Sequence, residues 1–151
     1  MKREKSLKNS FVKMCLLFTL VIFFNATYAQ LKSNSKVFLT YAETPNEVNV
    51  NGEDAKAMLK DYLIGKTTIQ VAETKEDSEF TLQLSLYEKN MGDRSAKFIL
   101  IDNKSSTIIL ETKWVRGTMN AFYGYSGSRH AIGRLVKDQL IDAFPSIEKN
   151  D

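Results

Sequence analysis

Cysteine and histidine, the side chains that most often bind metals or act as nucleophile and base, are almost missing from this 151-residue chain, which has one of each. Cys15 lies inside an apolar run near the N-terminus, so a domain that begins after this run has neither a disulfide nor thiol chemistry. His130 alone does not provide the Cys and His ligand set of a structural zinc site. We therefore expect no metal site and no cofactor.

A surplus of positive charge is also absent from most of the chain. The whole sequence has a formal net charge of +3, but residues 1–29 hold five Lys or Arg and one acid, Glu4. The remainder has 16 basic and 17 acidic residues, so its net charge is −1. Proteins that bind nucleic acid need a basic surface that displaces counterions from phosphates. The composition therefore argues against nucleic acid as a partner.

The first 29 residues have the organisation of a cleavable secretory signal peptide. A basic start, Lys2 to Lys13, precedes an apolar run of eleven residues, Met14–Phe24, and small residues end at Ala29. A membrane span needs about twenty apolar residues, so this run is too short to be an anchor. We predict cleavage after Ala29, no stable membrane anchor after cleavage, and export to the periplasm or, alternatively, secretion. The lack of disulfides favours a bacterial periplasm.

The rest of the chain is predicted to form one α+β domain. Residues 30–36 are expected to be a flexible lead-in, residues 37–147 the domain, and residues 148–151 a polar tail. Strict alternation of apolar and polar residues over 80–87 indicates a half-buried strand. Apolar runs bounded by polar turns predict the other strands, at residues 37–41, 67–71, 96–101 and 107–115.

Two segments have the period of amphipathic helices. Asn51 is the expected N-cap of the first helix, and Gly65 is expected to end it. The second helix is predicted from Arg129 to Phe144, with Pro145 ending it. The order is β-α-β-β-β-β-α, which we interpret as an antiparallel sheet with both amphipathic helices packed on one face.

The segment from Gly117 to His130 differs from the rest of the chain because three aromatic residues lie among three glycines. Binding residues are often found on such loops, so one interpretation is a ligand or partner surface, with a small anion at the N-terminus of the second helix. The other interpretation is a structural crossover whose rings fold under the helix and whose glycines permit a tight path. The candidate residues of the binding interpretation are Phe122, Tyr123, Tyr125, Ser126, Ser128, Arg129 and His130.

The sequence offers no clear catalytic constellation. Gly124–Ser128 resembles the hydrolase elbow G-x-S-x-G, but its second glycine comes one position early, and His130 follows too closely to complete a triad. Residues 47–52 resemble the start of a calcium loop, but Met58 stands where a bidentate Glu is needed. The carboxylates are scattered, and Trp114 is interpreted as a packing residue. We expect a protein that is not an enzyme.

Residues 77–82 and 98–111 follow a pattern found in bacterial envelope domains. An acidic turn opens a strand, and a later hairpin reads apolar-Asp-x-x-small-x-apolar before a final helix. In this respect residues 75–144 resemble the N-terminal domain of TolB and the curli-secretion lipoprotein CsgG. Unlike CsgG, this sequence shows no lipobox, and unlike TolB, it shows no propeller. The resemblance implies a non-catalytic periplasmic domain that contacts other envelope proteins, and it transfers no functional residue.

These observations leave three hypotheses. The first is an exported, non-enzymatic interaction domain that is an accessory of the cell envelope. The second is a protein that binds a small ligand or an anion through loop 117–130, and the third is an enzyme of unrecognised type. A pocket lined by Tyr123, Tyr125, Arg129 and His130 would favour the second or third. Buried rings would make the loop a scaffold and move the interaction surface elsewhere, for example to an exposed face of the sheet.

Overall fold

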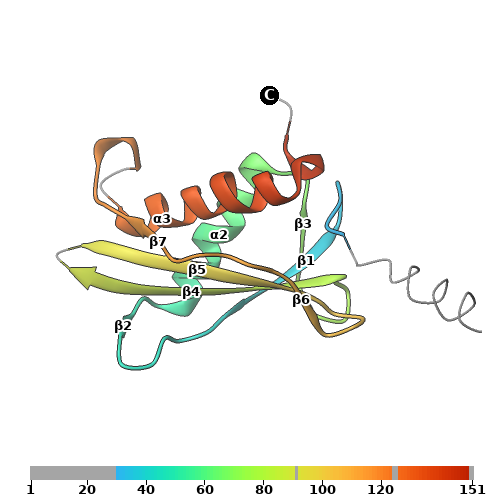
Figure 1. The fold of residues 1–151 in the computed structure, drawn as a ribbon, viewed down its shortest axis with the longest axis horizontal. Coiled ribbons are helices and arrows are strands. Elements are labelled where there is room, and N and C mark those ends of the chain that lie inside the picture. Colours follow the sequence, from blue (N-terminus) through green and yellow to red (C-terminus); the bar gives the residue numbers. More distant parts are fainter. Residues whose placement is uncertain (1–29, 91, 124–125, 150–151) are drawn as a thin grey trace, which may run out of the picture.

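The computed structural model describes residues 30–90, 92–123 and 126–149, apart from the side chains of Asn90 and Tyr123. The chain forms one sheet with two main helices (Figure 1). The strands are β1 (Lys36–Tyr41), β2 (Val48–Asn49), β3 (Gln70–Ala72), β4 (Phe80–Asn90), β5 (Asp93–Asp102), β6 (Thr107–Glu111) and β7 (Val115–Gly117). The helices are α2 (Gly52–Lys66), α3 (Gly127–Leu135), its π-helical continuation (Val136–Ile141), and 3-10 turns at Ala121–Tyr123 and Pro145–Ile147. The predicted signal peptide, residues 1–29, lies outside the described residues.

The N-terminal half of the domain is a parallel β-α-β unit. β1 pairs in parallel with β3, Val37 beside Val71, and α2 forms the crossover between them. β1 also pairs in parallel with β4, Leu39 beside Leu82. The sheet is therefore mixed, in the order β3-β1-β4-β5-β6, and the predicted wholly antiparallel sheet is wrong. The physical reason is that a helical crossover between two neighbouring strands makes them run parallel.

The C-terminal half contains the antiparallel meander that the sequence predicts. Leu84 of β4 lies opposite Phe98 of β5, and β6 pairs with the other side of β5. The predicted strand 107–115 is broken in two, because β6 ends at Glu111 and β7 pairs with β5 again from Val115, opposite Ala96. The break places three residues opposite two of β5, which makes it a bulge at the edge of the sheet.

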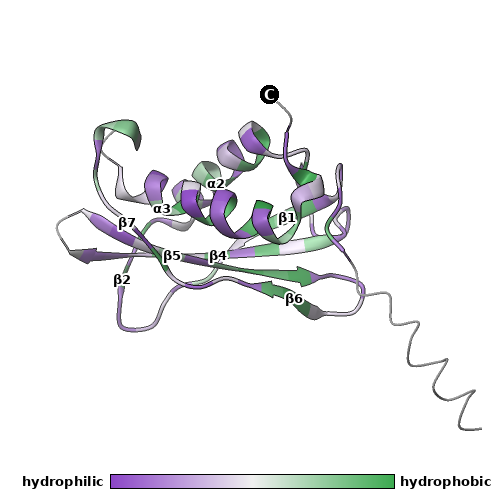
Figure 2. Ribbon diagram, turned by 45° about the horizontal axis from the view of Figure 1, so that its top comes forward, coloured by the Kyte–Doolittle hydropathy of each residue, from purple (hydrophilic) through white to green (hydrophobic). Residues whose placement is uncertain are grey.

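Both helices cover the same face of the sheet, as the sequence predicts (Figure 1). α2 packs on β1 and β3, and α3 packs on β5 and β7. Hydrophobic residues follow the strands and extend to β6 at the edge of the sheet (Figure 2). The large side chains that are fully buried between the two layers are Phe98, Leu31, Leu59, Leu63, Leu82, Leu84, Leu86, Leu100, Ile132, Leu135, Leu140 and Ile147.

Helix α2 begins as predicted but ends differently. The Asn51 side-chain oxygen accepts from the backbone N–H groups of Glu53, at 2.9 Å, and Asp54, at 3.2 Å. The predicted end at Gly65 is wrong, because the helix continues to Lys66. The hydroxyl of Thr67 then donates to the Leu63 carbonyl at 2.7 Å. A polar side chain thus satisfies a terminal carbonyl without a left-handed glycine.

Helix α3 begins at Gly127, two residues before the predicted start, and widens into a π-helix after Leu135. The widened part carries Gln139, which faces the bulge between β6 and β7. The Gln139 side-chain oxygen accepts from the Lys113 N–H at 2.8 Å, and its amide nitrogen donates to the Lys113 carbonyl at 3.3 Å. The helix therefore satisfies a peptide group that has no partner strand at this point.

Residues at both ends of the described chain take part in the fold. In the segment predicted as a flexible lead-in, Leu31 is fully buried and Lys36 begins β1. Near the C-terminus, the Thr68 N–H donates to the Ile147 carbonyl at 2.7 Å, and Glu148 forms a β-bridge with Thr67. Among the described residues, none of the helices is long and apolar enough to cross a membrane.

Candidate functional site

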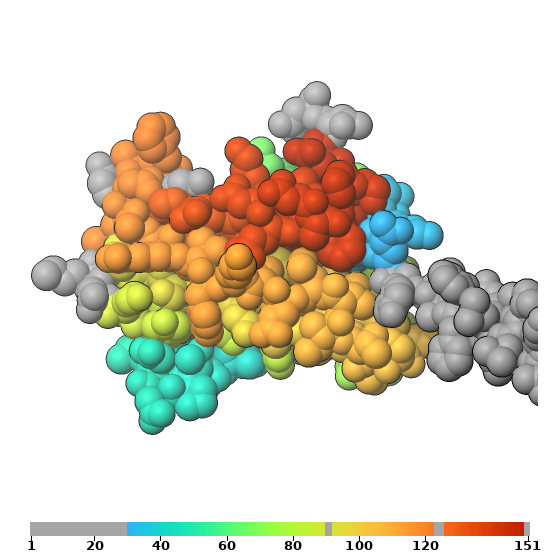
Figure 3. Space-filling view, viewed as in Figure 1, coloured from blue at the N-terminus to red at the C-terminus, as the bar shows by residue number. Residues whose placement is uncertain are grey.

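The predicted loop 117–130 connects β7 to α3 and projects from one end of the molecule (Figure 3). Phe122 lies in the 3-10 turn of this loop and is 97% exposed, and Met119 is 53% exposed. Tyr125 and the ring of Tyr123 lie outside the described residues. Phe122 is the one aromatic residue of this loop whose side chain the structure describes, and its ring is not folded under the helix.

The start of α3 lies directly against the backbone of its neighbours. A Cβ atom on Gly117 would clash with the Gly127 carbonyl oxygen, and one on Gly127 would clash with the Gly92 carbonyl oxygen. Ser126 caps the helix, its hydroxyl accepting from the Arg129 N–H at 3.2 Å, and Ser128 is buried. These glycines and serines build the crossover, whereas the side chain of Arg129 is exposed. Whether an anion binds here stays a prediction.

His130 connects α3 to the preceding loop. Its Nδ1 atom lies 3.1 Å from the Thr118 backbone nitrogen and 3.1 Å from the Asn120 amide nitrogen. Because a backbone N–H can only donate, Nδ1 accepts in the contact with Thr118. The Thr118 carbonyl oxygen lies 3.0 Å from the same atom. The imidazole thus connects the first turn of α3 to the loop before it.

The two segments that carry the envelope-protein pattern meet in the structure. The Asn103 amide nitrogen donates to the carbonyl of Ser78 at 3.1 Å, and its side-chain oxygen accepts from the Thr81 hydroxyl at 2.7 Å. Asp102 accepts from the Lys104 N–H at 3.1 Å and from the Ser105 hydroxyl. The Ser105 hydroxyl, more than any other group, holds the pKa of Asp102 below its ordinary value. These polar groups hold the turn 73–79 against the β5–β6 hairpin, which explains the pattern as structural.

An open depression of about 650 Å³ lies beside this junction and is lined by Glu76, Glu79 and Lys104 among others. Its polar lining residues Asp102 and Asn103 already bond to their neighbours. Within residues 30–149 as described, no group of three or more His, Cys, Asp or Glu side chains is arranged to hold a metal ion. The depression thus has the form of a surface hollow rather than an enclosed site.

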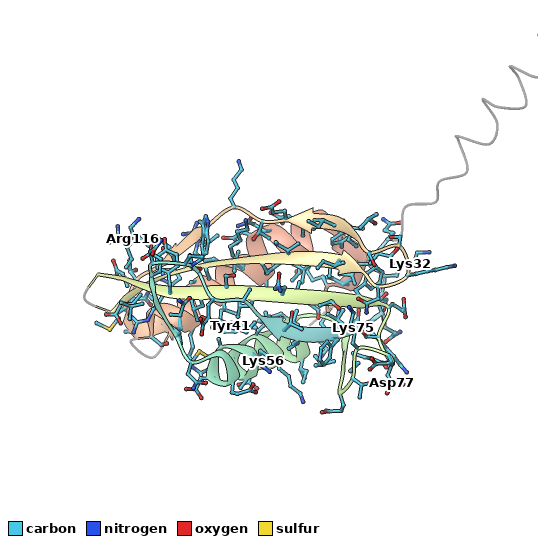
Figure 4. All side chains as sticks on the ribbon, turned by 90° about the horizontal axis from the view of Figure 1, so that it is seen from below. Lys32, Tyr41, Lys56, Lys75, Asp77 and Arg116 are labelled. Atoms are coloured by element: carbon cyan, nitrogen blue, oxygen red, sulfur yellow. The ribbon has the colours of Figure 1, made fainter. Side chains whose placement is uncertain are left out.

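The face of the sheet away from the helices, called the open face here, has no described helix packed on it (Figure 4). Trp114 is 44% exposed and packs its ring edge-on against Tyr87, with ring centroids 5.1 Å apart. The Lys97 ammonium lies 5.9 Å from the centre of the Trp114 ring and pairs with Glu111 at 2.5 Å. The half-buried side chains of the open face are Phe38, Thr40, Gln83, Ser85, Tyr87, Lys97, Ile99 and Ile101.

The sequence contained a signal for the open face that the strand prediction did not use. Residues 98–101 are four apolar residues in succession, Phe-Ile-Leu-Ile. Successive side chains of a strand point to opposite faces, so such a run makes both faces apolar. The alternation in β4 pointed to one apolar face only. Trp114 is a packing residue, as predicted, but it packs on the open face and keeps nearly half of its surface exposed.

No protein-family model and no curated protein sequence matches the chain. Similar folds occur among solved structures. PelC from Paraburkholderia phytofirmans, solved as a dodecamer, matches with a TM-score of 0.50 and 16% identity over 72% of this chain and 90% of that chain. A variant of the same PelC dodecamer matches with a TM-score of 0.51 and 17% identity, over 72% and 89% of the two chains.

TolB from Acinetobacter baumannii matches with a TM-score of 0.48 and 11% identity, over 81% of this chain and 31% of the longer TolB chain. The resemblance that the sequence indicated is confirmed, as a resemblance of fold, by the two PelC structures. At these identities the comparisons establish the fold class alone. The chain is thus an α+β domain whose fold is similar to that of PelC.

Proposed function

We propose that this chain is a non-enzymatic interaction domain of the cell envelope, which contacts other envelope proteins through the open face of its sheet. The observation that carries the proposal is the half-buried apolar surface of that face. When helices cover one face of a sheet, the other face contacts either water or a partner. A face that contacts water is mostly polar. Here Phe38, Ile99, Ile101, Tyr87 and Trp114 lie on the outer side.

Two further observations support this proposal. The N-terminal segment has the organisation of an export signal, which suits a periplasmic location. PelC, which shares the fold, was solved as a dodecamer, so domains of this shape can present surfaces to other protein chains. In the described loop, His130 uses its Nδ1 lone pair to hold Thr118 and Asn120, which favours a structural role over that of a general base.

Site-specific photo-crosslinking in cells that produce the protein tests the proposal. A photoreactive phenylalanine analogue replaces Ile99 on the open face or, as the matched control, Ile64 on α2, which is 48% exposed. We expect a discrete crosslinked product from position 99 that is absent from position 64. If neither position gives a product, or both give the same one, the open face is not the docking surface.

A second candidate function is favoured by two exposed residues of the segment 117–130, Phe122, which is 97% exposed, and Arg129. An apolar ring and a cation can contact a small aromatic or anionic ligand. A thermal-shift titration with inorganic phosphate and with benzoate tests it. Binding at the loop predicts stabilisation that Arg129→Gln abolishes, because ligands that bind the folded state raise its melting temperature. No shift with either probe excludes these two ligand classes.

A further inference from the structure

Loop 117–130 carries a ring that nothing described covers. Phe122, in the 3-10 turn Ala121–Tyr123, is 97% exposed, and Met119, earlier in the loop, is 53% exposed. The turn lies at the tip of the loop, which projects from one end of the molecule on the helix side of the sheet (Figure 1). Figure 2 shows hydrophobic residues at this tip. Residues 117–128 contain no charged side chain, although 26% of the whole chain is charged.

The base of the loop is held in place from two sides. The 3-10 turn packs on α3, and His130 Nδ1 lies 3.1 Å from the Thr118 backbone nitrogen. Met119 lies against Gly92 in the turn between β4 and β5, where a Cβ atom would clash with the Met119 sulfur. A segment that is ordered before it binds loses less conformational entropy on binding. Phe122 is thus presented on a fixed support.

Positive charge collects on the elements at both ends of the loop. Residues 113–137, which include β7, the loop and α3, hold five Lys or Arg and no Asp or Glu. Asp93 pairs with Arg116, and Asp138 pairs with Arg134 at 3.4 Å. The other three cations are exposed and have no carboxylate partner among the described residues. They are Lys113, Arg129 and Lys137.

Two exposed acids at the same end of the molecule lie on the other side of the sheet. Glu43 and Glu47 belong to the loop before β2, which extends on the open-face side, whereas loop 117–130 rises on the helix side (Figure 1). A negatively charged surface that attracts Arg129 therefore meets the apolar tip first, with the acidic loop facing away from it.

An apolar tip on a basic support suits a lipid bilayer better than a protein surface. A specific protein interface buries about 800 Å² on each partner, which a single projecting ring does not provide. Peripheral membrane proteins instead bury apolar side chains about 5–10 Å deep, at the boundary between the headgroups and the acyl chains. Basic residues near the surface add attraction to anionic lipids.

We propose that the tip of the loop, Met119 to Phe122, inserts reversibly into the surface of an anionic phospholipid bilayer. The ring of Phe122 enters the boundary of the acyl chains, and Arg129 lies beside the lipid phosphates. One inserted ring with a few cations gives reversible binding rather than a stable anchor. The inference goes beyond the proposed function and does not depend on it, because the tip and the open face share no residue.

Vesicle flotation tests the insertion with the chain from Gln30 onwards, which contains every described element and the whole core. One set of vesicles consists of neutral phosphatidylcholine, and the other contains in addition about 40% of the anionic lipid phosphatidylglycerol. Two variants change the loop. Phe122→Ser removes the ring, and Arg129→Gln removes the cation.

Two control variants make comparable changes away from the tip. Val48→Ser removes an apolar side chain that is 70% exposed, in β2 on the other side of the sheet. Lys75→Gln removes an exposed cation from the turn 73–79, and Figure 4 shows Lys75 at the opposite end of the sheet from Arg116. Both controls keep the loop intact.

We expect the wild-type chain and both controls to float with the anionic vesicles and far less with the neutral ones. Phe122→Ser should weaken binding at least about tenfold, because it removes the buried ring, and Arg129→Gln about fivefold. Raising the salt from about 0.1 M to about 1 M shortens the Debye length from roughly 10 Å to roughly 3 Å and should weaken binding. Inorganic phosphate at the concentration of the lipid phosphate should not displace the chain, because it offers nothing to Phe122.

Tryptophan fluorescence shows which part of the domain meets the lipid. Trp114, on the open face, is the only tryptophan of the chain. A chain with Phe122→Trp and Trp114→Phe therefore carries its one indole in the loop. Lipids brominated on their acyl chains should quench the indole at position 122 and leave Trp114 of the wild-type chain unquenched.

Five outcomes would each overturn the insertion. They are failure of the wild-type chain to float with anionic vesicles, wild-type binding by Phe122→Ser, equal losses in the controls, displacement by phosphate, and an unquenched indole at position 122. Displacement by phosphate would support the small-anion site instead. Crosslinking from position 99 is a separate test, because Phe122→Ser should leave its product unchanged. Loss of that product with intact vesicle binding would overturn the proposed function alone.

Discussion

Phe98 and Ile99 are neighbours in β5, yet they lie on opposite faces of the sheet. Phe98 is fully buried beneath the helices, opposite Leu84, whereas Ile99 is half-buried on the open face. A strand alternates its side chains between faces, so one strand supplies both the core and the proposed contact surface. The comparison teaches that the core and the proposed contact surface use interleaved but separable residues.

Phe98→Ala should give the largest effect, because it opens a cavity where the sheet packs on the helices. We expect a loss of about 3–5 kcal/mol in the free energy of unfolding, as for other fully buried phenylalanines. Urea denaturation followed by circular dichroism measures it. A loss below about 1 kcal/mol would mean that the covered face tolerates cavities, and the contrast between the faces would disappear.

Ile99→Thr is the matched change on the open face. It keeps a β-branched side chain in the strand and replaces the ethyl branch of a half-buried isoleucine by a hydroxyl that water can reach. We expect the free energy of unfolding to change by less than about 1 kcal/mol. The same denaturation series measures it beside Phe98→Ala. Equal losses for the two variants would show that the open face is part of the core rather than a surface for a partner.

Asp102 closes the covered-face row of β5, opposite Phe80, and should give the smallest effect. Its pKa is lowered in the folded protein, mainly by the Ser105 hydroxyl, so its stabilising contribution exists above the ordinary carboxyl pKa of about 3.9. That contribution is lost as the pH falls through the lowered folded pKa. Asp102→Asn should therefore flatten the stability profile below about pH 4 and leave its shape at higher pH unchanged. Unfolding curves of the wild type and the variant over this pH range measure the effect. Parallel stability profiles for the two proteins would show that Asp102 makes no such pH-dependent contribution.

The sequence predicted the features that depend on residues close together in the chain. Asn51 caps α2 because its short side chain reaches two free N–H groups of the first turn. The row Phe80, Leu82, Leu84 and Leu86 is buried as its alternation predicted. Both helices lie on one face because their apolar stripes have to be covered by the same side of the sheet.

Tertiary contacts decided what the sequence did not reveal. The parallel placement of β1 depends on its pairing with both β3 and β4, which no local pattern encodes. The break in the predicted strand 107–115 and the π-helix are linked by hydrogen bonds between Gln139 and Lys113, 26 residues apart. Of the candidate site, the position of the loop and the exposure of Arg129 could be predicted. An exposed face of the sheet was named as an alternative surface, but its residues were not, because the apolar run 98–101 was not used.

The two hydrogen bonds between Gln139 and Lys113 affect whether another strand can add to the edge of the sheet. An unpaired strand at the edge of a sheet is a template on which other chains can add, and aggregation begins there. At Lys113 both the N–H and the C=O are already taken by one side-chain amide, which imitates a neighbouring strand for a single residue. Another strand that aligned its backbone along this edge would find the N–H and C=O groups of Lys113 already bonded. At Lys113, therefore, a contact with another chain has to use side chains rather than the addition of a strand.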